Sequence, residues 1–413
     1  MYDVAALRAR IPALASGTAF FDGPGGSQTP AEVAQAIAAA LSAPLANRGT
    51  VNAAARNAEE IVVAARQAVA DLLGADPRGI VFGRSMTQLA YDLARTLADG
   101  WGPDDEVLVT RLDHDAHIRP WVQAAARAGA AVRWVDFDPQ SGELTAADVA
   151  AQLTARTRLV AVTGASNLIG TRPPLAEIAT LAHERGALFS VDAVHLAAHA
   201  PIDLAAFGAD LLFCSPYKFL GPHCGVLVAD PALLETLHPD KLAPAPDAVP
   251  ERFEYGTLPY ELLAGVSAAI DVIASLASDD DGGRSRRERV LAAMQAVEAH
   301  EDALRLELER GLGELPGVTQ WARAARRTPT LLLSFSDRPA ADVAQALAAL
   351  DINAPAGSFY ALEASRHLGL GDSGGLRVGL APYTDAGDVT RLLDGLAATL
   401  AGPARSMQAA PPR

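Results

Sequence analysis

Short apolar runs alternate with longer amphipathic stretches through most of the chain. Apolar residues recur at helical spacing over 56–73, and the alanine-rich stretches 121–128 and 175–185 predict further helices. Short, almost wholly apolar runs predict strands at 106–110, 132–137, 159–162, 188–191, 211–214 and 226–228. This alternation is typical of an α/β fold with a mostly parallel sheet that helices cover on both faces.

The pattern changes after about residue 277. Residues from Ser278 onward form a polar, turn-like segment, and residues 290–312 then predict one long helix. Residues 328–336 and 376–380 predict strands of a second, smaller α+β unit.

The length of 413 residues exceeds what one hydrophobic core usually holds, so we expect two domains. The large domain is predicted over 21–278 and the small C-terminal domain over 279–402. Residues 1–20 are expected to pack on the small domain. The Pro/Ala-rich residues 403–413 show no apolar period and are expected to be disordered.

Composition and charge narrow the class of protein. A hydrophobic fraction of 50% with 20% charged residues is typical of a folded globular chain. The net charge is −15 and no basic run of five or more residues is present, so nucleic-acid or membrane binding has no electrostatic basis. We expect no membrane span and no signal peptide. Two cysteines, Cys214 and Cys224, are too few for a disulfide framework, so we expect a cytoplasmic protein.

Candidate chemistry lies at the ends of the predicted strands, because ligands of parallel sheets bind there. Asp192 follows the run 188–191 and is either a helix N-cap or the partner of a protonated ring nitrogen. Lys218 lies in a turn after the run 211–214, among apolar or small neighbours. Desolvation there would lower the pKa of the lysine and make its amine a nucleophile that forms imines. Ser215 is placed to bind a phosphate oxygen.

In two further segments, the polar residues have more than one possible function. A dense cluster of possible metal ligands suggests a metal-dependent hydrolase and consists of Asp113, His114, Asp115 and His117. Adjacent residues point in different directions, so four converging ligands are not expected. The hydrolase is therefore only a distant alternative. A flat His114 stacked on an aromatic cofactor explains the same segment. Thr87 lies in a turn that enters a helix, and this turn either caps the helix or cradles a phosphate.

The phosphate turn, the His114 loop, Asn167, Asp192 and Lys218 follow one another at successive strand ends. This series resembles the class V aminotransferases of pyridoxal 5'-phosphate (PLP) fold type I, and within them the cysteine desulfurase and selenocysteine lyase branch. The resemblance covers about residues 20–400. It implies an aspartate aminotransferase-like fold, with a large domain around a mostly parallel seven-stranded sheet and a small α+β C-terminal domain.

The resemblance also implies a role for each site residue. Lys218 would bind PLP as a Schiff base and act as the catalytic base, Asp192 would pair with the pyridine nitrogen, and His114 would stack on the ring and assist catalysis. The remaining implied cofactor contacts are His195, Asn167, Thr87, Ser215, Tyr217 and Thr257. Thr257 would reach the neighbouring active site of a homodimer. The substrate would be contacted by Arg377, Asn167 and Tyr360, and Arg377 would bind the α-carboxylate of the substrate.

Three departures from the family pattern bear on the reaction. Tyr217 replaces a phosphate-binding His, Pro355 replaces an arginine, and Tyr360 stands in the loop that carries the nucleophilic Cys of desulfurases. Cys224 is either a substitute for that nucleophile or a buried structural cysteine, and the second reading is favoured.

The implied function is therefore that of a PLP enzyme acting on a small amino acid through an external aldimine. We expect lyase-type C–S or C–Se cleavage without a cysteine persulfide. An aminotransferase or an epimerase is the alternative, and a protein that binds PLP without catalysis is a weaker one.

Overall fold

The computed structural model describes residues 2–277 and 283–402. The tail predicted at 403–413 and the boundary predicted between 278 and 279 lie outside the described residues. The extent of each domain therefore stays a prediction. Within the two described ranges, no helix combines the length and the apolar character that crossing a bilayer requires.

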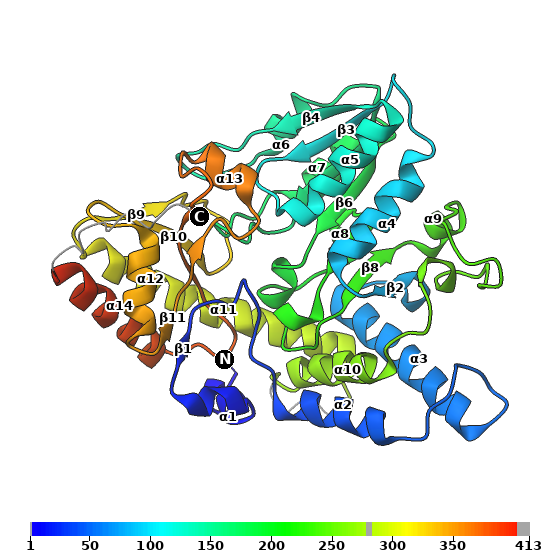
Figure 1. Ribbon diagram of the computed structural model, residues 1–413, viewed down its shortest axis with the longest axis horizontal. Coiled ribbons are helices and arrows are strands. Elements are labelled where there is room, and N and C mark those ends of the chain that lie inside the picture. Colours follow the sequence, from blue (N-terminus) through cyan, green and yellow to red (C-terminus); the bar gives the residue numbers. More distant parts are fainter. Residues whose placement is uncertain (1, 278–282, 403–413) are drawn as a thin grey trace, which may run out of the picture.

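A seven-stranded sheet forms the centre of the larger part of the molecule (Figure 1). Its strands lie in the order β2-β8-β7-β6-β5-β3-β4. Strand β8 runs antiparallel to both its neighbours, and all other adjacent strands are parallel. The strands are β2 (Ile80–Gly83), β3 (Glu106–Thr110), β4 (Ala131–Val135), β5 (Thr157–Thr163), β6 (Leu188–Asp192), β7 (Leu211–Cys214) and β8 (Gly225–Ala229).

Helices cover both faces of this sheet, because successive residues of each strand point to opposite faces. Leu108 of β3 packs in one core with helices α3 (Ala53–Leu73), α7 (Leu175–His183) and α10 (Tyr260–Ala274). Its neighbours Val107 and Val109 pack in a second core with α4 (Met86–Ala98) and α5 (Arg119–Ala128). The strands are thus apolar on both sides, as their continuous apolar runs predict.

The smaller C-terminal domain is built on a four-stranded antiparallel sheet in the order β12-β13-β10-β9. A separate apolar core joins this sheet to its helices. The elements are β9 (Val318–Trp321), β10 (Thr330–Phe335), β12 (Ala356–Gly357), β13 (Gly375–Gly379), α11 (Arg286–Gly313), α12 (Ala340–Ala348), α13 (Leu362–His367) and α14 (Ala386–Ala401).

The N-terminal segment lies against this C-terminal part (Figure 1). After α1 (Val4–Ala9), strand β1 (Ala19–Phe20) pairs in parallel with β11 (Ile352–Asn353). Arg8 forms a 2.6 Å ion pair with Asp388. Directly after β1, Asp22 bridges to Gly379 at the end of β13. The chain then runs through α2 (Ala31–Ser42) to α3. This route brings the 22–26 loop between the two sheets.

Candidate active site

One cavity of about 630 Å³ lies where the strands β5, β6 and β7 end and α4 begins. It brings together nearly all the residues that the sequence singles out. These are Thr87, His114, Asn167, Asp192, His195, Ser215, Tyr217, Lys218, Tyr360 and Arg377. Their roles remain predictions, but their convergence on one cavity is a finding.

Lys218 closes a 3₁₀ turn, Pro216–Lys218, that follows β7 directly. Its Nζ donates hydrogen bonds to the carbonyl oxygens of Pro24 and Gly25, the latter at 2.9 Å. It also lies 4.6 Å from the ring centroid of Tyr217. Burial, with a smaller contribution from Arg377, lowers the pKa of Lys218 to about 8. Near neutral pH, a larger fraction of this amine is therefore uncharged than in a free lysine, although the charged form still predominates.

Asp192 ends β6 and points into the cavity from a largely buried position, with 4% exposure. Its Oδ1 accepts a 2.9 Å hydrogen bond from the N–H of Val194. Burial raises the pKa of Asp192 to about 6. A cationic ring nitrogen beside it would offset that desolvation and keep the carboxylate ionised.

His114 is held as a neutral imidazole. Burial, together with the charge on Lys218, lowers the pKa of His114 to about 4. Its Nδ1 accepts a 3.1 Å hydrogen bond from the N–H of Ala116, so the ring proton lies on Nε2. His114 can therefore donate from Nε2, while Nδ1 is occupied.

The first turn of α4 opens into the same cavity, where Ser85, Met86 and Thr87 line the wall. The Ser85 side chain caps the helix by accepting from the N–H of Gln88 at 3.1 Å. The N-terminus of a helix attracts anions through its free N–H groups and its dipole. Ser215 and Tyr217 line the cavity from the β7 side. Together these groups can hold a phosphate.

Arg377, on β13, enters the cavity from the smaller domain. Its guanidinium forms a 2.6 Å ion pair with Asp22 and donates to the carbonyl of Asn167 at 3.1 Å. It also stacks 3.7 Å from the ring centroid of Phe359. A buried guanidinium held flat in this way is preorganised for bidentate binding of a carboxylate.

The loop between β12 and α13 covers one side of the cavity. Phe359 and Tyr360 both have positive φ, 52° and 59°, which costs backbone energy in residues with a Cβ. Two hydrogen bonds hold them there. The Asn167 side chain donates to the carbonyl of Phe359 at 3.0 Å, and the N–H of Asp115 donates to that of Tyr360 at 2.7 Å. Tyr360 is 76% exposed, and its ring centroid lies 5.5 Å from that of His114.

His195 connects the two sheets behind the cavity. Its Nε2 lies 3.0 Å from the hydroxyls of both Thr328 and Thr330, which belong to the C-terminal part of the chain. Its Nδ1 is buried and has no hydrogen-bond partner among the described residues. Burial lowers the pKa of His195 well below its usual value, so the ring is neutral.

Both cysteines lie outside the cavity lining and are buried. Burial raises the pKa of Cys224 to about 12 and also raises that of Cys214. Neither thiol is therefore available as a thiolate near neutral pH. The predicted burial of Cys224 is confirmed, and its structural role stays a prediction.

Thr257 does not line the cavity. It lies on the exposed segment that follows the 3₁₀ turn Glu251–Phe253. The segment that carries Thr257 therefore contributes no residue to the cavity of its own chain. The predicted contact to a neighbouring subunit stays a prediction.

The metal-site alternative is wrong. The Asp113 and His117 side chains bond to each other in the core, Asp115 pairs with Arg119 at 2.7 Å, and His114 faces the cavity. These side chains diverge because neighbouring residues of the turn point in different directions. No group of three or more His, Cys, Asp or Glu side chains in residues 2–277 and 283–402 is arranged to hold a metal ion.

Several residues that shape the cavity were not predicted. Pro24 and Gly25 supply carbonyls to Lys218, Asp22 pairs with Arg377, and Phe359 stacks on it. The GPGG segment at 23–26 was the available signal. A Cβ on Gly25 would lie 2.2 Å from the Asp22 carboxylate, so a larger residue there would displace the Asp22 side chain.

The cavity suits PLP. Asn167 Oδ1, His195 Nδ1 and Arg377 Nε are buried polar atoms that find no partner in the described part of the chain, and all three residues line the wall. Such atoms normally have partners, so they indicate a polar ligand. The Asp192 carboxylate matches the pyridine nitrogen of PLP, and the Lys218 amine matches its aldehyde. The N-terminus of α4 matches its phosphate. The residues present therefore fit the cofactor that the resemblance implies.

Comparison with known proteins identifies the family. The sequence model described as aminotransferase class V matches residues 19–392. The chain belongs to the class V aminotransferase family. An uncharacterized protein of Mycobacterium tuberculosis is 35% identical over 399 residues, which are 96% of this chain and 99% of that protein. A probable cysteine desulfurase of Pseudomonas aeruginosa is 30% identical over 402 residues, or 93% of this chain and 95% of that protein.

Solved structures agree with this assignment. The crystal structure of the cysteine desulfurase CsdA from Escherichia coli superposes with a TM-score of 0.83 at 27% identity, covering 97% of this chain and 99% of that one. The PLP fold type I that the resemblance implies is confirmed. Class V aminotransferases and cysteine desulfurases depend on PLP, so this chain is a PLP enzyme of that class.

Proposed function

We propose that this class V enzyme is a lyase that cleaves a C–S or C–Se bond in a small amino acid without a cysteine persulfide. The observation that carries this proposal is that neither cysteine of the chain reaches the cavity. Tyr360 stands on the covering loop, and both cysteines are buried outside the lining. A persulfide mechanism requires an accessible thiolate, which neither cysteine supplies.

Each of four cavity residues has a separate role in this reaction. PLP, when bound, supplies an electron sink for a carbanion at the substrate Cα. Lys218 anchors the cofactor and takes the Cα proton, a task suited to an amine with a pKa of about 8. Asp192 holds a proton on the ring nitrogen. Arg377 binds the α-carboxylate, and the Asn167 side chain orients the bound substrate.

The leaving group requires a proton in addition. As the Cβ–S or Cβ–Se bond breaks, its electron pair stays on sulfur or selenium, which then takes a proton. Lys218, having taken the Cα proton, can pass it to this leaving group. The neutral His114 can donate a hydrogen bond to the leaving group from Nε2, and Tyr360 lies beside it, with 5.5 Å between the ring centroids. Overall, the amino acid and water give a 2-oxo acid, ammonium and a thiol, hydrogen sulfide or selenide. This stoichiometry needs no oxidant and no sulfur acceptor on the protein.

Product analysis tests the proposal. The holoenzyme is incubated with cysteine, selenocysteine, S-substituted cysteines and alanine, and the oxo acid, ammonium and released thiol or selenide are measured. We expect equal amounts of oxo acid and sulfur or selenium product, and retained turnover in a Cys214→Ala/Cys224→Ala variant. Sulfur retained on the protein would contradict the proposal.

The same assay separates the alternatives. Oxo acid formed without a sulfur product, and only in the presence of an oxo-acid acceptor, would indicate an aminotransferase. Exchange of the Cα proton with D₂O without either product would indicate an epimerase. Complete spectral silence toward all amino acids would indicate binding of PLP without catalysis.

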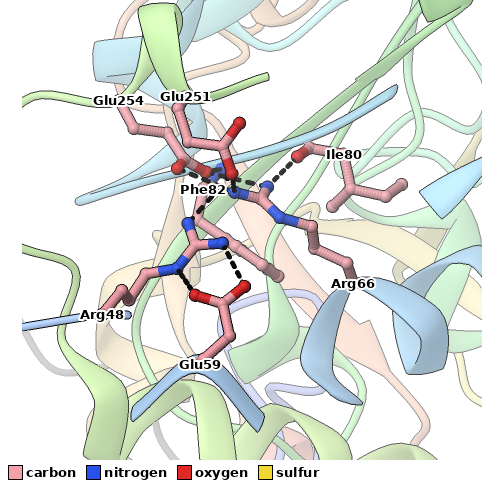
Figure 2. Close-up of polar contacts among 7 residues, drawn as sticks. All are labelled: Arg48, Glu59, Arg66, Ile80, Phe82, Glu251 and Glu254. Atoms are coloured by element: carbon pink, nitrogen blue, oxygen red, sulfur yellow. Dashed lines mark hydrogen bonds and ion pairs between the residues drawn. The ribbon is translucent and has the colours of Figure 1, made fainter. Parts of the chain in front are cut away.

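We also propose that the enzyme is a homodimer in which Thr257 reaches the neighbouring active site. The support is local: Thr257 is exposed and outside its own cavity, yet the segment before it is firmly anchored. Figure 2 shows Glu251 and Glu254 of this segment held by Arg48 and Arg66. An anchored but exposed binding residue is suited to a partner site. A cytoplasmic location stays a prediction.

A further inference from the structure

The His195 ring joins the two domains at the wall of the cavity. It lies three residues after Asp192 and lines the cavity. Its Nε2 is 3.0 Å from the hydroxyl oxygens of both Thr328 and Thr330, and Thr330 begins β10 of the smaller domain. The ring and both threonines are buried. The position of each proton is therefore constrained, because a buried O–H or N–H without an acceptor is costly.

The two threonine hydroxyls differ in their other partners. The hydroxyl of Thr328 also lies 3.3 Å from the carbonyl oxygen of Gly170, to which it can donate. For the hydroxyl of Thr330, residues 2–277 and 283–402 offer no acceptor other than the His195 ring. The Thr330 hydroxyl is therefore satisfied only if it donates to Nε2 of His195.

This assignment fixes the position of the ring proton. Burial lowers the pKa of His195 well below its usual value, so the ring is neutral near neutral pH. Positive charge on His199, Arg377 and Lys218 acts in the same direction. A neutral imidazole has one N–H donor and one acceptor nitrogen. Because Nε2 accepts from Thr330, the ring proton lies on Nδ1.

The proton on Nδ1 needs an acceptor from outside the chain. Nδ1 is buried and finds no partner in the part of the chain that the structure describes. The His199 ring meets the His195 ring edge-on at 4.6 Å between centroids, without a hydrogen bond to Nδ1. A buried donor on a residue that lines a cavity indicates an acceptor atom on the ligand. PLP carries such an atom, the phenolic oxygen beside the aldehyde that Lys218 attacks.

We propose that Thr330 holds His195 in the tautomer with its proton on Nδ1, so that His195 donates a hydrogen bond to the phenolic oxygen of PLP. Thr330 is then a positioning residue, and it acts on the cofactor from a strand of the smaller domain. The inference rests on the cofactor contact predicted for His195. It does not depend on which reaction the enzyme catalyses.

The test is the ¹⁵N spectrum of the His195 ring in cofactor-free protein labelled with ¹⁵N-histidine. The chemical shifts of the two ring nitrogens show which of them carries the proton, and the signals are assigned by their loss in His195→Gln. We expect a protonated Nδ1 and an unprotonated Nε2 in the parent at neutral pH. A protonated Nε2 in the parent would overturn the inference, and this result needs no threonine variant that folds.

Thr328 and Thr330 provide a matched pair of variants, because both are buried and both lie 3.0 Å from Nε2. In Thr330→Val, Nε2–H can donate to Thr328 while Thr328 donates to Gly170, so we expect the proton to move to Nε2. In Thr328→Val, Thr330 still donates to Nε2, so the parent tautomer should remain. Thr330→Ser should keep it as well. The same result in both valine variants, whether a switch or none, would contradict the role of Thr330.

A second measurement detects the contact with PLP in holoenzyme without substrate. A hydrogen bond donated to the phenolic oxygen stabilises negative charge there and favours loss of the proton that this oxygen shares with the imine nitrogen. The pH midpoint of the visible absorbance change should therefore rise by about one pH unit in Thr330→Val, the effect of one hydrogen bond. It should stay unchanged in Thr328→Val.

The His195→Ala variant separates the two parts of the inference. An equal pH midpoint in His195→Ala and the parent would show that His195 does not contact the phenolic oxygen, whatever its tautomer. Neither measurement uses an amino-acid substrate, so failure of the proposed lyase reaction would leave both results unchanged.

Discussion

Lys218 owes its chemistry to where its turn places it. The lysine side chain is half-buried between the 22–26 loop and Tyr217, and this burial lowers its pKa to about 8, against about 10.4 for a free lysine. Only the uncharged amine attacks the aldehyde of the cofactor. The uncharged fraction grows as pH rises through the pKa.

We therefore predict that the rate at which cofactor-free protein captures PLP rises with pH and reaches half its maximum at about pH 8. Absorbance of the bound cofactor follows this rate in stopped-flow mixing. The charge on Arg377 also lowers the pKa of Lys218, so Arg377→Gln should move the midpoint to higher pH. A midpoint in the parent at about 10.4, the pKa of a free lysine, would show that burial does not act on Lys218 as described.

Much of the site was readable from residue types at strand ends. Asp192 and Lys218 each follow a short, wholly apolar run, and parallel strands bring such ends to one edge. The contacts of Lys218 with Pro24 and Gly25 were not readable, because they join positions far apart in the sequence through the path of the N-terminal segment. The ion pair of Arg377 with Asp22 was not readable for the same reason, since it also joins positions far apart in the sequence.

At the scale of elements, the apolar runs predicted the central strands and the long helix α11 correctly, with ends displaced by a few residues. The pattern did not predict β2, because its four residues form too short an apolar run to be recognised as a strand. It also did not predict that β8 runs antiparallel to its neighbours. Strand direction depends on the connections between elements. An apolar run has the same composition in either direction.

The ion-pair network in Figure 2 anchors α3 to β2 and to the segment before Thr257. Arg66 contacts Glu254 at 2.9 Å, and both side chains are buried. Removing one partner of such a pair leaves an uncompensated buried charge. We predict that Arg66→Met lowers the free energy of unfolding by roughly 3–5 kcal/mol.

Urea denaturation measures this loss. The matched control is Arg78→Met, which removes an exposed arginine that pairs with Asp76 at 2.6 Å and should leave the unfolding midpoint unchanged. Equal effects of the two substitutions would show that burial does not set the strength of the Arg66 pair.

At the scale of the whole molecule, the proposed homodimer makes a prediction about mixed dimers. If Thr257 serves the neighbouring site, a dimer of one Lys218→Ala subunit and one Thr257→Val subunit contains one intact site. A dimer of one parent subunit and one subunit carrying both changes contains none. We predict normal PLP affinity at the functional lysine only in the first dimer.

Fluorescence titration of purified mixed dimers with PLP measures this difference. If the second dimer binds PLP as tightly as the parent does and the first does not, Thr257 acts within its own subunit. If a monomer binds PLP with full affinity, no partner residue is needed.

The central claim is that Lys218 carries the cofactor, and chemical trapping tests it most directly. Holoenzyme is reduced with borohydride and digested, and the pyridoxyl-labelled peptide is identified by mass spectrometry. The label should lie on Lys218 alone, and Lys218→Ala should yield no labelled peptide while retaining its fold. A label on any other lysine, or equal labelling of the Lys218→Ala variant, would contradict the account.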